Sequence, residues 1–338
     1  MKHWGTVIKL LIAAALVTFV VHQVGLDTLL EKWKNIDKLL FLAGAAFLPI
    51  GISFSALRWR WLLRVNELDL SVGQALRFTW IGVFFSNVVP GLTGGDVIKA
   101  VYVAKATGKK LRPVLSVLVD RVMGLLGLAV VAAVAALFWI EDERFIWLAA
   151  GLWGGLVLLG LGVALFLSRR VRKLVRLDAL LRKLPGKDVL MQFDQALTLY
   201  RGHMPGMALW LGLSSLNHVF SLLGWVLINE ALHGHMSWSS VLVLVPISQI
   251  LTAIPLAPGG WGIGEFSIQW LWGQFGPAAV SVEVMKAEGT ALSIIYRIHQ
   301  MLWSLIGALS LVISGGRPSS EEMKQAMDDP EHYPTPST

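Results

Sequence analysis

The chain has 338 residues, of which 55% are hydrophobic and only 15% are charged, and its mean hydropathy is +0.64. A composition this apolar excludes an ordinary soluble domain and predicts a protein that crosses a membrane several times. The net charge of +7 stands beside apolar runs. That placement favours membrane topology and anionic lipid headgroups, with no nucleic acid as partner. The absence of cysteine excludes disulfides and thiolate metal sites.

The first half of the chain alternates long apolar runs with one interrupted pair of shorter runs. Spans are predicted at 5–24 (uncleaved), 39–57, 113–140 and 145–167, and two shorter arms at 72–89 and 97–104. Lysine and arginine mark the cytoplasmic side, and both ends of the paired arms are basic. We therefore expect a cytoplasmic amino terminus and a hairpin that enters from the cytoplasm and returns there.

A basic linker follows the fourth span. Residues 169–188 hold eight basic side chains against two acids, interleaved with leucine and valine. The pattern is typical of an amphipathic helix on the inner leaflet, with anionic lipids as partners at 169–187. A solvated topology signal without a specific lipid partner is the alternative.

The second half repeats the order of the first. Spans are predicted at 207–232 and 287–313, hairpin arms at 241–254 and 266–275, and a disordered cytoplasmic tail at 315–338. The second hairpin opens outward, so inversion across the membrane plane relates the halves. We predict an all-α polytopic membrane protein with about six transmembrane helices and two re-entrant broken hairpins in an inverted repeat. The predicted units are 1–38, 39–140 (hairpin 72–104), 141–206, 207–314 (hairpin 239–275) and 315–338.

Both hairpins turn at a stretch of proline and glycine that ends in an acid. The stretches are Asn-Val-Val-Pro-Gly-Leu-Thr-Gly-Gly-Asp at 87–96 and Pro-Leu-Ala-Pro-Gly-Gly-Trp-Gly-Ile-Gly-Glu at 255–265. Hydrocarbon offers no hydrogen bonds to the freed backbone, which must be buried in protein or line a wet cavity. Broken segments in matching positions of two halves indicate a transport site.

Charged residues inside the spans are the next candidates, because they are expensive in hydrocarbon. Asp120 and Arg121 lie about two turns into one span, and Arg297 with His299 lies about as deep in another, from the opposite face. The arginines could hold a phosphate from each side of the membrane. Alternatively, Asp120 neutralises one of them, or each arginine caps the carbonyls of a broken hairpin.

Asp96 and Glu265 each follow a glycine turn and open a short arm. A carboxylate there can cap the amides of the helix start, or it can lose and regain a proton during transport. The glycine loops could also cradle a phosphate with backbone amides. The candidate substrate-binding residues are Arg60, Asn87, Gly94, Gly95, Asp96, Asp120, Arg121, Gly259, Gly260, Glu265 and Arg297.

Four motifs together resemble the flippase-like family named after the membrane region of bacterial lysylphosphatidylglycerol synthase. They are Arg58-Trp59-Arg60-Trp61-Leu62-Leu63, the stretch 87–96 with Lys99 where the family commonly has arginine, Asp120-Arg121-Val122-Met123-Gly124, and the stretch 255–265. The resemblance covers about 5–313. It implies a membrane domain with re-entrant helices that moves a lipid, in the best-understood members an aminoacylated phospholipid, from the inner to the outer leaflet.

The resemblance implies a lipid translocase of the bacterial cytoplasmic membrane, with both termini cytoplasmic and a phospholipid or polyprenyl-phosphate lipid as cargo. Those members continue into an aminoacyl-transferase domain where this chain has a short tail, so we expect it not to make the lysyl-lipid itself. We expect no enzyme activity, metal or cofactor, since no nucleotide, zinc or Ser-His-Asp pattern stands out. The alternatives are a proton-coupled transporter of a small anion and a scaffold that recruits a lipid-modifying enzyme.

Overall fold

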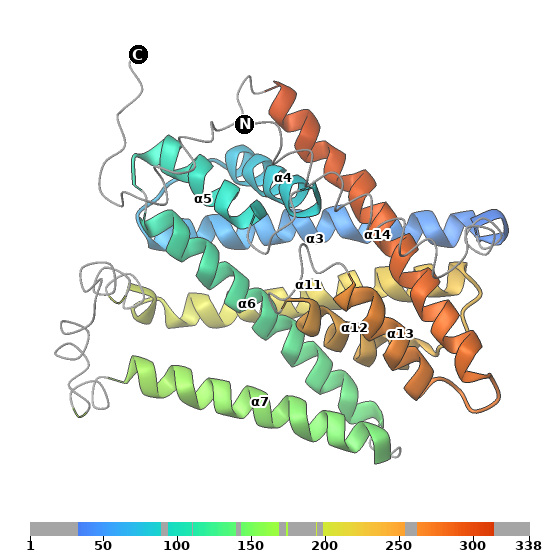
Figure 1. Cartoon of the computed structure of the whole chain (residues 1–338). Coiled ribbons are helices and arrows are strands. Elements are labelled where there is room, and N and C mark those ends of the chain that lie inside the picture. The colour runs from blue at the N-terminus through green and yellow to red at the C-terminus, as the bar shows by residue number, and fades with distance from the viewer. Residues whose placement is uncertain are drawn as a thin grey trace, which may run out of the picture.

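The computed structural model describes residues 33–88, 94–109, 111–139, 143–168, 174, 194, 199–253 and 262–313, and these residues contain helices and no strand (Figure 1). The all-α prediction is confirmed for them. The predicted first span, the basic linker apart from Leu174 and the tail lie outside the described residues. The elements are α3 (Lys38–Val65), α4 (Val72–Val88), α5 (Gly94–Thr107), α6 (Leu111–Ala136), η1 (Leu137–Trp139), α7 (Glu143–Leu167), α11 (Met204–Ala231), α12 (Trp238–Ala253), α13 (Ile263–Phe275) and α14 (Val282–Ile313).

Three of these helices, α3, α6 and α11, are long and apolar enough to cross a membrane, judged by length and composition. Shorter apolar stretches occupy α12 and residues 146–162 of α7. The 32-residue α14 also corresponds to a predicted span, but Lys286, Glu288 and Arg297 interrupt its apolar run. The chain is thus a polytopic membrane protein in which three of the predicted spans are strongly apolar and α14 carries a polar face.

Helix α3 begins at a side-chain cap and runs further than the sequence predicts. The Asp37 carboxylate accepts hydrogen bonds from the amides of Leu39 and Leu40 at 2.9 and 3.0 Å, which satisfies donors that have no intrahelical partner. The helix continues past the predicted end of the span at residue 57 and ends at Val65. Arg58 does not start a cytoplasmic loop, because its side chain is buried and paired inside the protein.

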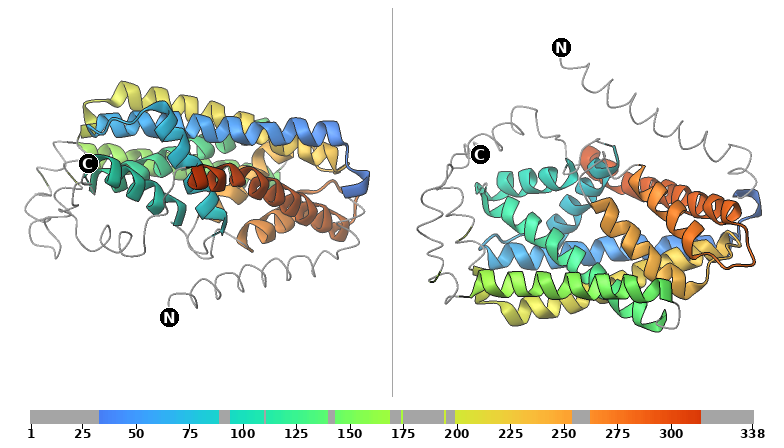
Figure 2. Two further views of the ribbon diagram at one scale, coloured as in Figure 1. Left: turned by 90° about the horizontal axis from the view of Figure 1, so that it is seen from above. Right: turned by 60° about the horizontal axis from the view of Figure 1, so that its bottom comes forward.

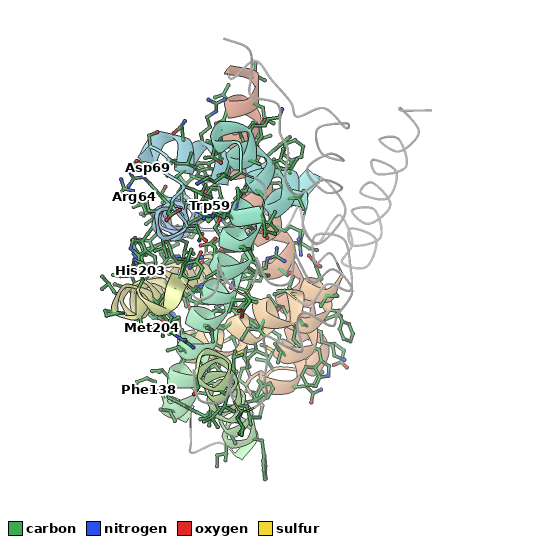
Figure 3. All side chains as sticks on the ribbon, turned by 90° about the vertical axis from the view of Figure 1, so that its left-hand side faces the viewer. Trp59, Arg64, Asp69, Phe138, His203 and Met204 are labelled. Carbon is green, nitrogen blue, oxygen red and sulfur yellow. The ribbon has the colours of Figure 1, made fainter. Side chains whose placement is uncertain are left out.

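The two long helices α3 and α11 lie side by side and form one layer along an edge of the molecule (Figure 2). The Asp37 amide before α3 donates to the Ala231 carbonyl at the end of α11 at 2.9 Å, and Trp61 near the end of α3 packs at Gly206 near the beginning of α11. The two helices, seen end-on in Figure 3, are therefore antiparallel.

Two glycines set the distance between α3 and α11. A Cβ on Gly44 would lie 2.9 Å from the carbonyl oxygen of Gly224, and one on Gly224 would lie 2.8 Å from that of Gly44. A side chain at either position would force the backbones apart, as in other membrane helix crossings built on small residues.

The two hairpins exchange partners between the halves. The first arm of each hairpin packs on the last helix of the other half, α4 on α14 and α12 on α6. The second arm packs on the last helix of its own half, α5 on α6 and α13 on α14. Helix α7 stands apart along one edge and packs chiefly on α6 (Figure 1). The predicted order of span, broken hairpin and span is present in both halves, and the halves interlock.

Candidate functional site

A cavity of about 540 Å³ lies where the two halves meet. Its wall is built by α3, α4 and α6 from the first half and by α11, α12, α13 and α14 from the second. The volume falls within the roughly 300–1,000 Å³ that is usual for small-molecule sites. Both candidate arginines, Arg121 of α6 and Arg297 of α14, line this cavity, and so does Asn87 at the end of α4.

The first arginine is paired with the acid of the first hairpin. A guanidinium nitrogen of Arg121 lies 2.7 Å from a carboxylate oxygen of Asp96, which stands in the first turn of α5. A negative charge in this position also interacts favourably with the positive end of the helix dipole. The side chains of Asp96 and Arg121 are 24% and 39% exposed, so water screens this pair in part.

The second arginine is paired in the same way, but this pair is less exposed to solvent. Arg297 Nε donates a short hydrogen bond to the Glu265 carboxylate in the first turn of α13, and their side chains are 13% and 6% exposed. The other oxygen of Glu265 accepts a hydrogen bond from the Gly262 amide at 2.6 Å. Gly262 has φ +83°, a conformation that favours glycine. Glu265 therefore caps α13, as predicted, and also neutralises Arg297.

Asp120 has a different role from either one predicted for it. Its carboxylate pairs with Arg58 Nε at 2.8 Å and with Lys99 Nζ at 3.5 Å, while Lys99 also lies 4.3 Å from the centre of the Trp59 ring. Arg58 in turn donates to the Ser214 hydroxyl at 2.5 Å. The suggestion that Asp120 neutralises Arg121 or Arg297 is wrong, since it pairs with two other cations. Asp120 does not line the cavity, so it is not placed to contact a substrate there.

This group of four residues, Arg58, Lys99, Asp120 and Ser214, is called here the buried charge cluster. It joins α3, α5, α6 and α11. All four side chains are buried, so the pairing in the cluster compensates charges that would otherwise be costly in a low-dielectric interior. The cluster holds the first hairpin and the neighbouring Arg121 in place.

The remaining predicted residues fall into three groups. Gly95 serves packing, because a Cβ there would lie 2.1 Å from the Gly82 carbonyl oxygen of α4, and Gly95 does not line the cavity. Gly94 begins α5 next to it. Arg60 donates to the Leu70 carbonyl at 2.7 Å, in the connection to α4, and is also outside the cavity wall. Gly259 and Gly260 lie outside the described residues.

Sequence reasoning missed two kinds of residue. The predicted span at 39–57 leaves Arg58 outside it, although a buried Asp120 calls for a buried cation nearby. The amides of Asn217, Gln249 and Gln300 line the cavity and were not singled out. A usable signal existed for α11, where Asn217 and Ser221 stand four residues apart in an apolar helix and therefore share a face.

The cavity wall also holds a histidine. His218 Nε2 lies 2.9 Å from the carbonyl oxygen of Gly124, a contact between α11 and α6. Within the described ranges, no three His, Cys, Asp or Glu side chains are arranged to hold a metal ion. The wall thus offers two guanidinium groups and one imidazole, surrounded by amides and hydroxyls.

Comparisons with known proteins point to one family. The model of the lysylphosphatidylglycerol synthase transmembrane region matches residues 6–314. A UPF0104 membrane protein of Pyrococcus horikoshii is 24% identical over 132 residues, which cover 38% of this chain and 39% of that relative. The matched part is thus well under half the length of the curated relative. No solved structure matches the chain.

Proposed function

Since the chain belongs to the lysylphosphatidylglycerol synthase transmembrane-region family, we propose that it is a translocase that moves a lipid with an anionic headgroup across the cytoplasmic membrane. The cargo is a phospholipid or a polyprenyl-phosphate-linked lipid. The observation that carries the proposal is that Arg121 and Arg297, contributed by opposite halves, line a single cavity.

The ion pairs explain how two arginines can line the cavity while the protein stays stable with no ligand bound. Asp96 and Glu265 neutralise the arginines without lining the cavity themselves. A phosphate can then make bidentate contacts with a guanidinium and compete with the carboxylate for it. In this mechanism the headgroup crosses inside the protein from one arginine toward the other, while the acyl or prenyl tails stay in the lipid. The protein performs no chemistry on the lipid.

Three further elements of the proposal concern placement and partners. Both termini face the cytoplasm, in accordance with the basic character of the loops on that side. The basic segment 169–187 contacts anionic lipids of the inner leaflet. An enzyme that modifies the same lipid is a suitable partner for the cytoplasmic face.

The proposal is tested in proteoliposomes that contain acyl-labelled phospholipids, by measuring how fast the label becomes accessible in the opposite leaflet. Arg121→Ala and Arg297→Ala should each lower the rate at least about tenfold, since each removes a charge-assisted phosphate contact. Arg64→Ala is the matched control, because Arg64 is an exposed arginine that pairs with Asp69 at 3.2 Å. Wild-type rates in both cavity variants would refute the proposal. Proton-driven uptake of a small anion without lipid movement would favour the anion-transporter alternative.

A further inference from the structure

The part of the cavity wall that surrounds the arginines is neutral and rich in hydrogen-bonding groups. Three side-chain amides line it, Asn217 of α11, Gln249 of α12 and Gln300 of α14, together with several serine and threonine hydroxyls. Within the described part of the chain, none of these three amides makes a side-chain hydrogen bond. Of the three residues, Asn217 is the most buried, with 9% of its surface exposed.

Amides that line a cavity and make no side-chain hydrogen bond within the described residues are free to bond with a ligand that enters it. An amide offers two N–H donors and one carbonyl acceptor, and a hydroxyl is likewise both donor and acceptor. A ligand with several hydroxyls would satisfy the three amides in both directions. An ammonium group carries only donors and would leave their N–H groups unpaired.

The wall is also unsuited to a cationic group on electrostatic grounds. Among the described residues that line the cavity there is no Asp or Glu, and the two charged side chains are Arg121 and Arg297. The hairpin loops at 89–93 and 254–261 contain no acidic residue in their sequences. The carboxylates nearest to these arginines, Asp96 and Glu265, are already paired with them, so a lysyl, ethanolamine or choline headgroup would find no unpaired carboxylate in the described wall.

Aromatic faces, the other common partner of ammonium groups, are partly occupied in this wall. Trp225 and Tyr296 line the cavity but stack on each other, with ring centroids 3.6 Å apart and ring planes 16° apart. Each ring thus has one face covered by the other.

We infer that the headgroup carried by this cavity is anionic and polyhydroxylated, a phosphate or phosphodiester that bears a sugar, inositol or glycerol, with the phosphate on the arginines and the hydroxyls on Asn217, Gln249 and Gln300. The inference rests on the proposed translocase function and narrows its cargo. An aminoacylated or zwitterionic phospholipid is excluded as the preferred cargo.

The test compares five lipids with the full-length protein: phosphatidylinositol, phosphatidylglycerol, a polyprenyl-phosphate hexose, phosphatidylethanolamine and lysyl-phosphatidylglycerol. Binding is measured by native mass spectrometry and translocation in proteoliposomes. The hydroxyl-rich anionic lipids should bind about tenfold more tightly than the two amine-bearing lipids. Preference for the polyprenyl-phosphate hexose over the two glycerolipids, or the reverse, would identify which lipid class supplies the headgroup.

Asn217→Leu isolates the role of the amides. It should weaken binding of the preferred lipid about three- to tenfold, the expected effect of one lost hydrogen bond, and leave binding of phosphatidylethanolamine unchanged. The melting temperature should not fall, because the Asn217 amide makes no side-chain hydrogen bond with any residue that the structure describes. Asn35→Leu, at an exposed helical position just before α3, is the control and should change neither quantity.

Two outcomes would contradict the inference in different ways. Equal or tighter binding and faster movement of the amine-bearing lipids would overturn the headgroup assignment and leave translocation standing. Failure to move any of the five lipids would overturn the translocase proposal and the headgroup assignment together.

Discussion

The two hairpins carry equivalent acid–arginine pairs that differ in their exposure to solvent. In both, an acid in the first turn of the second arm pairs with an arginine on the following long helix. The Asp96–Arg121 pair is partly exposed and stands next to the buried charge cluster. The Glu265–Arg297 pair is nearly buried, and the residue before Glu265 is held by the Ser267 hydroxyl, which donates to the Gly264 carbonyl at 3.0 Å. We infer that the first pair can exchange its partner more easily, while the second contributes more to stability.

The largest effect is expected behind the first hairpin. Asp120→Asn would leave Arg58 and Lys99 buried without their carboxylate. Removing one partner of a buried pair typically costs about 3–5 kcal/mol. Thermal unfolding of the purified protein in detergent measures this, with Asp69→Asn as the exposed control. A loss no larger than that of the control would show that the cluster is solvated and would weaken the contrast between the hairpins.

The next prediction compares the hairpin pairs directly. Glu265→Gln should destabilise the protein by about 3 kcal/mol, because it removes a buried charge partner of Arg297 and weakens the cap of α13. Asp96→Asn should cost less than about 1 kcal/mol, since its pair is screened by water. Both values come from the same unfolding assay. The reverse order would mean that exposure does not decide which pair is structural.

The glycines of the two hairpins provide a smaller and more local comparison. Gly95→Ala should destabilise by about 1–3 kcal/mol, because its Cβ would overlap the backbone of α4 at Gly82. Gly264→Ala should cost less than about 1 kcal/mol, since its Cβ would lie 3.2 Å from the Thr252 hydroxyl and from the movable end of Arg297. Unfolding temperatures of the two variants check this, and similar losses would show that the arms are equally tightly packed.

The smallest effect concerns an ion pair outside the spans. The hydrogen bond and the charge of Arg112, 2.5 Å from the carboxylate, lower the pKa of Glu67 from its usual value. Because the folded-state pKa is depressed, the pair stabilises the fold at neutral pH, and this contribution is lost as the pH falls below the usual range of a glutamate and through that lowered pKa. The wild type should melt slightly above Glu67→Gln near neutral pH, and the difference should vanish in acid. If the difference in melting temperature between the two proteins grew in acid, the pKa of Glu67 would be raised in the folded state and the prediction would be wrong.

The positions of the helices could be predicted from the sequence, whereas most of the side-chain pairs between distant residues could not. Apolar runs and breakers placed the arms of both hairpins within a few residues of α4, α5, α12 and α13, because hydrocarbon allows few backbone conformations. Long-range pairing was harder to infer. Asp120 and Arg121 are neighbours in sequence but point to different partners, since adjacent residues on a helix do not share a face. Arg58 was misplaced because a basic run next to tryptophans also fits the end of a span.

The exchange of arms between the halves has a consequence for how the protein is made. The α4 surface that packs on α14 is synthesised early, and its partner is the last described helix to leave the ribosome. The first hairpin must therefore enter the membrane with one flank covered only by lipid. The fold can therefore be completed only after α14 has been synthesised. Because both hairpins pack on α14, loss of this helix would leave each of them without one of its packing partners.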